Sequence, residues 1–485
     1  MIVMLVTLPL LLAALGPEAF GMWVLLQTFS GVNGWLSLAD AGIGLAMTRL
    51  VATRTATMDH DGARHAVGSG FAILGTFGVV CALGLAAVGP ATLPALFNVP
   101  TEQATSFRTA IAVFALNVLG EIVVRGIGAA LEGFQRVDLA RAVDAARRTL
   151  VAFATVGVAH AGGGLVDVVI ASTVATFAAV IIAAVTLAAL MRGAGAGAPR
   201  ARRGDVVELL SYGTTVGALN LTGVLHRVMD KLIVGALFGP SGVALIEVAT
   251  QFQNGASAIL SATSYAAMSS SPWLQARGDA DALRKLLLRG TRYCLLVTLP
   301  IVGVAIVLSG PIVRLWVGPR FAEAAGLTVV ALVYIGLAAP MQVGQNLLQG
   351  VGSAGLVLRA GAIAVVVNLA ASLVLADVVG LVGVLQGSLL SLIVLLPPMT
   401  HSVLSVTQTS LRTFLHDAFV PALMPALLVT IAAGMVALVP DLPDVARIAA
   451  SGAAAAVVLV PTAIRWGIDP TDLADLRRRF RRSPA

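Results

Sequence analysis

The sequence predicts an all-α polytopic membrane protein, with about 14 transmembrane helices forming two related lobes of six helices and a C-terminal helix pair. Of its 485 residues, 58% are hydrophobic and only 11% are charged, and the mean hydropathy is +0.94. Soluble domains carry about 25% charged residues, so this composition excludes an ordinary water-soluble globule. Apolar runs of about 20 residues recur from end to end and do not alternate with polar residues, which favours helices over a β-barrel.

The expected spans follow one another with short loops between them. They cover residues 1–15, 18–48, 66–90, 107–130, 147–160, 164–191, 207–237, 241–270, 292–313, 324–348, 356–376, 380–400, 417–439 and 445–464. Cytoplasmic loops carry an excess of Lys and Arg, which tests this threading. If the C-terminal "RRRFRR" and every second loop are cytoplasmic, most of the 31 basic residues fall on that side. We therefore expect both termini in the cytoplasm. The net charge of +7 does not indicate nucleic-acid binding, because the arginines lie in short loops between spans.

An internal repeat predicts the two lobes. "ALGPEAFGMWVLLQTFSG" at 14–31 aligns with "LFGPSGVALIEVATQFQNG" at 237–255, and "DGARHAVGSG" at 61–70 aligns with "DALRKLLLRG" at 281–290. "ALEGFQRVDLAR" at 130–141 aligns with "LLQGVGSAGLVL" at 347–358. The three matches have similar offsets and the same order, which is typical of a parallel two-lobe repeat.

The repeat and the Gly/Pro/Arg-rich break near the middle of the chain define the expected domains. They are an N-lobe (1–191), a basic cytoplasmic linker (192–206), a C-lobe (207–400), a C-terminal helix pair (401–466) and a basic cytoplasmic tail (467–485). The first span has few residues, about 22 Å at 1.5 Å each, so we expect the first helix to be truncated in this sequence. A short span in a locally thinner bilayer is the alternative.

Ionisable residues inside the spans are the candidate functional residues. A charge at mid-bilayer costs at least about 2.5–3.5 kcal/mol, so such residues usually face a polar interior and carry function. They are Asp40, Glu121, Arg125, Arg227, Asp230, Lys231 and Glu247. Arginine fits phosphate bidentately and stays charged. We therefore expect Arg125, Arg227 and Lys231 to bind an anionic headgroup, with Asp40, Glu121 and Asp230 as charge partners or as sites that exchange H⁺ or Na⁺.

Each candidate also has a purely structural interpretation. Arg125 can extend its side chain to the headgroups, or it can neutralise Glu121 four residues earlier on the same helix. Asp40 can stabilise a kink beside the glycines of "LADAGIG". Arg227 and Asp230 can form an internal salt bridge. Glu247 can lie near the surface.

Enzyme signatures are absent from the sequence. We find no metal-ligand spacing, no Gly-rich phosphate loop and no nucleophile elbow, and Cys81 and Cys294 fall inside apolar runs. We therefore expect no catalytic residues, no metal and no cofactor. A membrane-embedded glycan polymerase or ligase needs a large periplasmic loop with catalytic residues, and the longest such loop here, 91–106, offers only Glu102.

Several motifs resemble a known family. "ALGPEAFGMWVLLQTFSGVNGWLSLADAGIGLAMTRLVA", "MDKLIVGALFGPSGVALIEVATQF" and "RLWVGPRFAEAA" are similar to the polysaccharide transporter, or O-antigen (oligosaccharide) flippase, branch of the multidrug/oligosaccharidyl-lipid/polysaccharide exporter superfamily. Asp40 matches the family's Asp-x-Gly in the second span, and Asp230-Lys231 matches its Asp-Lys/Arg in the seventh.

The resemblance implies six-helix bundles around a central cavity and alternating access. It implies that a polyprenyl-diphosphate-linked oligosaccharide moves from the cytoplasmic to the outer leaflet of a bacterial plasma membrane for cell-surface polysaccharide synthesis. The expected partners are that lipid-linked glycan, membrane lipids, a polysaccharide polymerase and glycosyltransferases, and no nucleic acid. A drug/cation antiporter and a lipid II flippase of the same fold remain alternatives.

Overall fold

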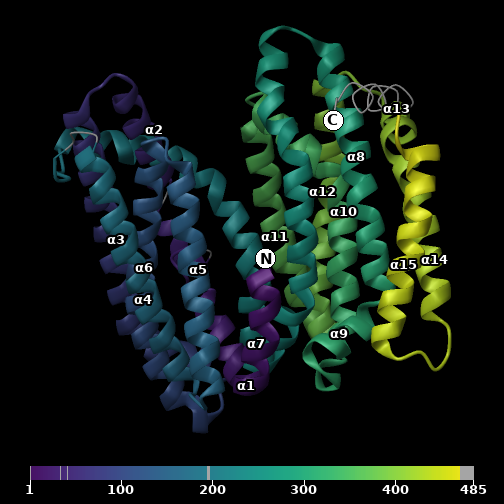
Figure 1. The fold of residues 1–485 in the computed structure, drawn as a ribbon, viewed down its shortest axis with the longest axis horizontal. Helices are drawn as coiled ribbons and strands as arrows, with labels where there is room; N and C mark the ends of the chain where they lie inside the picture. The colour runs from purple at the N-terminus through teal and green to yellow at the C-terminus, as the bar shows by residue number, and fades with distance from the viewer. Residues whose placement is uncertain (1, 33, 41, 194–196, 470–485) are drawn as a thin grey trace, which may run out of the picture. The chain divides into compact units, whose positions relative to one another are not determined.

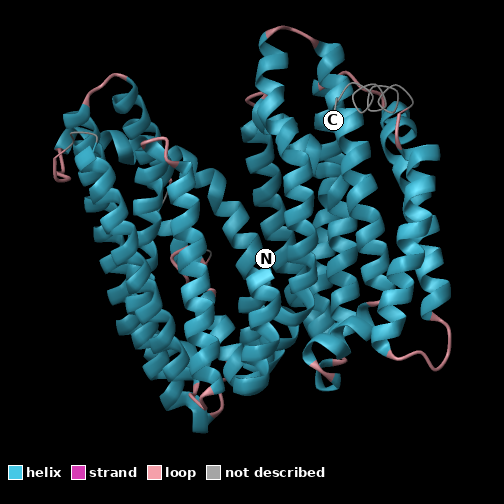
Figure 2. Cartoon of the chain, viewed as in Figure 1, coloured by secondary structure: helices cyan, strands magenta, loops and turns pink. Residues whose placement is uncertain are grey.

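The computed structural model describes residues 2–32, 34–40, 42–193 and 197–469. Helices and the turns between them make up these residues, and no strand occurs among them (Figure 2). Eleven of the described helices are long and apolar enough to cross a membrane. The fold class is therefore confirmed. The expected number of about fourteen spans is approximate, because two of the eleven helices are kinked and the span expected at 147–160, in α5 (Val137–His160), is not one of the eleven.

The chain forms two compact units, Met1–Glu247 and Val248–Ala485. Unit 1 contains α1 (Ile2–Gln27), η1 (Trp35–Asp40), α2 (Ile43–Ala56), α3 (His60–Leu96), α4 (Thr101–Gly133), α5 (Val137–His160), α6 (Leu165–Gly193) and the first part of α7 (Arg203–Ala276) (Figure 1). Unit 2 contains the rest of α7 and α8 (Ala280–Val307), α9 (Ser309–Val317), η2 (Pro319–Phe321), α10 (Ala324–Gly350), α11 (Ala354–Val379), α12 (Leu381–Val406), α13 (Leu411–Phe414), η3 (Leu415–Phe419), α14 (Val420–Ala437), α15 (Asp444–Thr462) and η4 (Ala463–Gly467). The lobe boundary expected at 192–206 stays a prediction.

Helix α4 is the central helix of unit 1. Phe107, Ile111, Phe114 and Leu131 are fully buried along it, and its buried positions lie on all of its faces. A helix that is apolar all round lies inside a bundle rather than at its edge. Glu121, in the buried part of α4, is therefore surrounded by protein rather than by lipid.

The repeat is visible in the backbone, where corresponding features recur about 220 positions apart. Both Gly-Pro motifs kink a helix at a glycine with positive φ, Gly16 in α1 (φ 77°) and Gly239 in α7 (φ 71°). Asp59 and Asp279 each cap the next helix by accepting a hydrogen bond from the backbone N–H three residues later. Further residues of positive φ recur about 220 positions apart, namely Met58 with Gly278, Asn98 with Gly318, Gln135 with Gly352, and Gly162 with Gly380.

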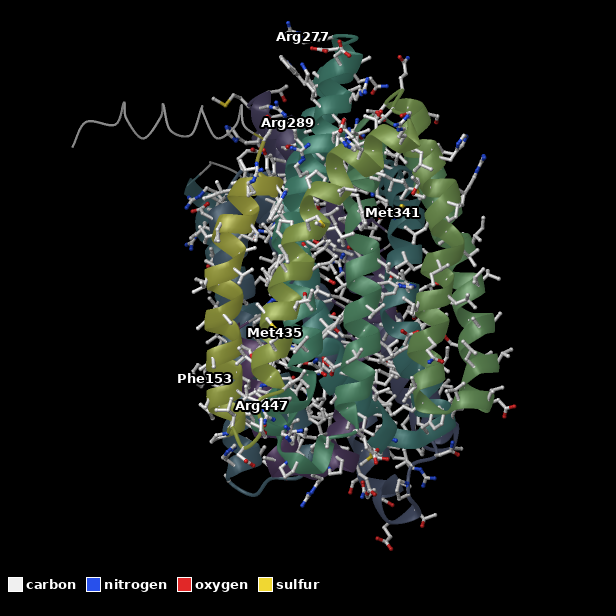
Figure 3. The ribbon with its side chains drawn as sticks, turned by 90° about the vertical axis from the view of Figure 1, so that its right-hand side faces the viewer. Phe153, Arg277, Arg289, Met341, Met435 and Arg447 are labelled. Carbon is white, nitrogen blue, oxygen red and sulfur yellow. The ribbon has the colours of Figure 1, made fainter. Side chains whose placement is uncertain are left out.

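In unit 2, the C-terminal helices pack on the bundle through specific contacts. Ser451 Oγ of α15 donates to the carbonyl of Ala433 in α14 at 3.1 Å. Arg314 of α9 makes two hydrogen bonds to Asp444 of α15, at 3.0 and 2.8 Å. Arg277 and Arg289 lie toward one end of this unit and Arg447 toward the other, as the threading requires (Figure 3). Which end faces the cytoplasm stays a prediction.

Candidate functional site

The second span, expected to be continuous over 18–48, is broken. Helix α1 ends at Gln27, a 3-10 turn covers Trp35–Asp40, and α2 begins after Gly42, which has a φ of 78°. Glycine accounts for the break: a Cβ at Gly34 would overlap the backbone of Thr28 and Ser30. Prediction of one helix was wrong because the hydropathy is uninterrupted, whereas "FSGVNGW" puts two glycines where the chain must fold back on itself.

Glu121 of α4 holds this break in place. Its Oε2 accepts hydrogen bonds from Ser30 Oγ at 2.6 Å and from the Gly31 N–H at 2.7 Å, and its side chain is 5% exposed. A broken helix in a membrane leaves backbone donors without partners unless protein groups satisfy them. Glu121 satisfies one such donor, so it has a clear structural role.

Asp40 and Arg125 form the main ion pair of the site. Arg125 Nε lies 2.9 Å from Asp40 Oδ2, and its Nη1 donates to the Val32 carbonyl at 3.1 Å. Asp40 Oδ1 also accepts from the Gly44 N–H at 2.7 Å, which caps α2. The expected pairing of Arg125 with Glu121 is wrong. The break brings a different carboxylate, Asp40, to Arg125, while Glu121 is bound to Ser30 and the backbone of the break.

Arg147 of α5 is a buried arginine that the sequence analysis missed. Its side chain is 8% exposed, with Nη1 3.9 Å from Glu121 Oε1 and Nη2 3.5 Å from Asp144 Oδ1. Arg148 also binds the Asp144 carboxylate, with its Nε 2.8 Å from Asp144 Oδ2. The expected span 147–160 begins with these two arginines, and the sequence analysis did not include them among the candidate residues. The signal that could have identified them is the acid-to-base spacing of "DAARR", which places both arginines one turn from Asp144 on a helix.

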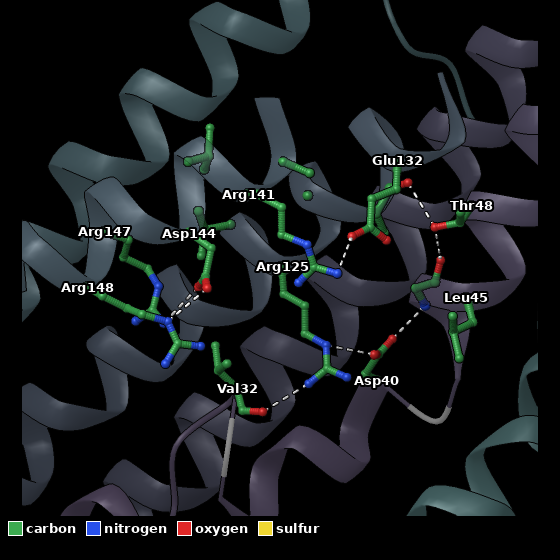
Figure 4. Close-up of a pocket in the computed structure, with 16 residues that line it drawn as sticks. Val32, Asp40, Leu45, Thr48, Arg125, Glu132, Arg141, Asp144, Arg147 and Arg148 are labelled. Atoms are coloured by element: carbon green, nitrogen blue, oxygen red, sulfur yellow. Dashed lines mark hydrogen bonds and ion pairs between the residues drawn. The ribbon is translucent and has the colours of Figure 1, made fainter. Parts of the chain in front are cut away.

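A pocket of about 330 Å³ in unit 1 is lined by both the Asp40–Arg125 ion pair and the arginines of α5 (Figure 4). Its walls come from the break, α2, α4 and α5. Four arginines and three acidic residues line it, namely Arg125, Arg141, Arg147, Arg148, Asp40, Glu132 and Asp144. Arg125 and Arg148 remain about a third to a half exposed. The arrangement can therefore bind an anion, provided that the anion competes with the carboxylates that hold the arginines.

The predicted residues of α7 lie elsewhere in unit 1. Lys231 Nζ lies 2.5 Å from Glu247 Oε2, across the kink at Gly239. Glu247 is 12% exposed, so it is not a surface residue. "HRVMDK" at 226–231 is helical, in agreement with the span expected over 207–237. Asp230 precedes Lys231 on the same helix, and the side chain of Arg227 lies outside what the structure describes. Among the described residues, no group of His, Cys, Asp and Glu is placed to hold a metal.

Comparison with known protein families identifies the family of the chain. The model of the family described as "Polysaccharide biosynthesis protein" matches residues 11–326. The chain belongs to this family. The matched range includes all of the pocket residues and the kinks of α1 and α7. The comparison with curated proteins gives no match.

Solved structures share the fold of this family member. The lipid II flippase MurJ, in an inward closed conformation, has a TM-score of 0.73 at 10% identity, covering 96% of both chains. An inward-facing multidrug resistance MATE family transporter has a TM-score of 0.68 at 14% identity, covering 84% of this chain and 96% of its own.

A third similar structure is a MOP superfamily transporter from Pyrococcus furiosus, whose binding pocket is described as reversed in polarity. Its TM-score is 0.57 at 15% identity, covering 84% of this chain and 92% of its own. This member of the polysaccharide biosynthesis family is thus a multi-pass membrane protein, and its fold is the one found in these three solved structures.

Proposed function

We propose that the protein flips a polyprenyl-diphosphate-linked oligosaccharide from the cytoplasmic to the outer leaflet of a bacterial plasma membrane by alternating access, with both termini in the cytoplasm. The observation that carries the proposal is the arginine-lined pocket of unit 1 in a chain of the polysaccharide biosynthesis family. A lipid diphosphate is the anion in such a pathway that must cross hydrocarbon, and desolvated guanidinium groups bind it.

Arg125 is the arginine best placed to bind the diphosphate. It is about a third exposed, and its guanidinium group is oriented by Asp40 and by the Val32 carbonyl. An arriving phosphate can replace Asp40 at Arg125, because Asp40 keeps a second partner in the Gly44 N–H. The buried Arg147 adds positive charge from the other wall, and Arg148 can reach the ligand from the rim.

The carboxylates of the pocket give a means of coupling. When the pocket is empty they neutralise the arginines, and when the diphosphate binds they are released and can take up H⁺ or Na⁺. Asp40 is the first candidate for this exchange, because binding at Arg125 removes its ion-pair partner. A pH or Na⁺ gradient that changes the flipping rate would support this role.

A reconstituted flipping assay tests the proposal. Proteoliposomes receive fluorescent polyprenyl-diphosphate oligosaccharide, and a membrane-impermeant reductant reports how much reaches each leaflet. We expect Arg125→Ala to lower the flipping rate about 10- to 100-fold, which corresponds to the loss of one charged hydrogen bond of about 1.5–3 kcal/mol. Arg125→Lys should keep part of the activity, since lysine retains the charge without the bidentate geometry.

A matched control is Arg136→Ala. Arg136 lies just before α5 but is exposed, and it pairs with Asp138 outside the pocket. Equal flipping by wild type, Arg125→Ala and Arg136→Ala would refute the role of the pocket. Lipid II and a cationic dye are tested as further substrates. Faster movement of lipid II than of the oligosaccharide lipid would favour a lipid II flippase, and faster movement of the dye would favour a drug/cation antiporter.

A further inference from the structure

The unit-2 half of α7 carries an uncharged polar face. Residues 248–276 contain no Asp, Glu, Lys, Arg or His, although they belong to a membrane span. Polar side chains recur there every three to four residues, so they lie within one arc of the helix. They are Gln253, Asn254, Ser257, Ser261, Ser264 and Tyr265. From Gln253 to Tyr265 this face rises about 18 Å, more than half of the hydrocarbon thickness.

Helix α10 places a second such face beside the first. It consists of Gln342, Gln345, Asn346 and Gln349, again at spacings of three and four. Asn346 joins the two helices, because its Nδ2 donates to the Ser264 carbonyl at 3.1 Å and to Ser264 Oγ at 3.0 Å. We call these two faces together the polar seam of unit 2.

Several side chains of the polar seam have free hydrogen-bonding capacity. Gln345 is partly exposed, Asn254 and Gln349 are exposed, and none of the three bonds to another described residue. The Tyr265 ring is 65% exposed. An amide without a partner in hydrocarbon costs several kcal/mol, so these groups are expected to meet a polar ligand or water. Because no charge is present, the complementary ligand is a neutral one rich in hydroxyl groups.

We infer that the polar seam binds the sugar residues of the transported glycan. Amides offer both donors and acceptors, which match sugar hydroxyls, and an exposed tyrosine offers a flat face for the C–H side of a sugar ring. The inference rests on the proposed function and assigns the two parts of the substrate to different places. The arginines of unit 1 hold the diphosphate, and the seam holds the glycan.

Two substrates separate this inference from the proposed function. The first is lipid-linked oligosaccharide extracted from cells that express the protein, and the second is the same lipid trimmed by exoglycosidases to its first sugar. We expect Tyr265→Ala and Gln345→Leu each to lower flipping of the full-length lipid about 10-fold, the effect of about 1.4 kcal/mol, and to leave the trimmed lipid within about twofold of wild type. Arg125→Ala should slow both lipids.

Two further variants complete the test. Tyr265→Phe keeps the ring face and should keep the rate on the full-length lipid. Gln386→Leu removes a half-buried amide from α12, a helix that contributes no residue to the seam, and should change neither rate. Wild-type rates on both lipids in the seam variants, or an equal loss on both lipids, would overturn the inference while leaving the proposed function intact. A wild-type protein that flips neither lipid would overturn both.

Discussion

Replacing Glu121 with alanine tests whether this residue holds the broken span in place. In the native structure Glu121 Oε2 accepts from Ser30 Oγ and from the Gly31 N–H, at 2.6 and 2.7 Å. Hydrogen bonds to a carboxylate contribute about 1.5–3 kcal/mol each, so the two together contribute roughly 3–6 kcal/mol. The variant also removes a carboxylate that lies 3.9 Å from the buried Arg147 guanidinium.

The expected result is a local opening of the break between α1 and α2. A loss of about 3 kcal/mol shifts an opening equilibrium by more than about 100-fold. Hydrogen–deuterium exchange of a peptide containing Gly31 should therefore accelerate by roughly that factor, and the Tm in detergent should fall. Ser30→Ala removes only the hydroxyl donor and should have a smaller effect, of about 1 kcal/mol.

Glu132→Ala is the matched control for this experiment. Glu132 is also a glutamate of α4, but its side chain is 33% exposed and its ion-pair partner, Arg141, is 3.9 Å away. Exposed pairs contribute about 0–1 kcal/mol, so exchange at Gly31 should not change. The reasoning is refuted if Glu121→Ala and Glu132→Ala give the same exchange rate at Gly31.

Four further substitutions, at three positions of unit 1, have defined expectations, each measured as the Tm of the purified protein. Gly21→Leu should prevent stable folding, because even a Cβ at Gly21 would overlap the carbonyl of Pro240; a Tm like that of wild type would contradict this close approach. Gly16→Ala should cost about 1–3 kcal/mol from backbone strain alone, since φ is 77° and ψ is 168°, a region that essentially only glycine adopts, and no atom lies near the new Cβ; no loss of Tm would mean that the kink relaxes. Arg54→Ala should cost about 3–5 kcal/mol, because Arg54 binds Asp205 through two nitrogens at 2.9 and 2.6 Å and Asp205 is buried. Arg54→Lys should recover only part of that loss, and full recovery would argue against bidentate binding.

The sequence was sufficient to predict the helical fold and the repeat. Span length depends on bilayer thickness, so hydropathy alone locates most helices. The Gly-Pro motifs at Gly16 and Gly239 predict corresponding points in the two lobes, and both glycines kink their helices with nearly the same φ. These features are local or periodic, and a single chain displays them without an alignment.

The candidate site was predicted only in part. Asp40, Glu121 and Arg125 are recognisable because charge is rare in apolar spans. Their partners are not recognisable, because the break at residues 28–42 is set by tertiary hydrogen bonds that hydropathy does not report. Arg147 was missed for a related reason: it follows a charged segment, so it reads as a loop residue until α5 is seen to bury it against Glu121.

The two lobes share a fold but differ in the helix that follows the Gly-Pro kink. In unit 1 the helix after the Gly-Pro kink stops at Gln27, whereas α7 continues from its own kink to Ala276. A break exposes backbone donors and makes room for side chains, and charged groups of α4 and α5 fill that room. An unbroken helix has no free backbone donors and leaves no such room. The polar side chains of residues 248–276 in unit 2 are neutral, and Ser264 accepts hydrogen bonds from Asn346 of α10. If the proposed function is correct, the substrate has a charged head and a neutral glycan, and a duplicated fold whose lobes differ in this way offers a surface for each.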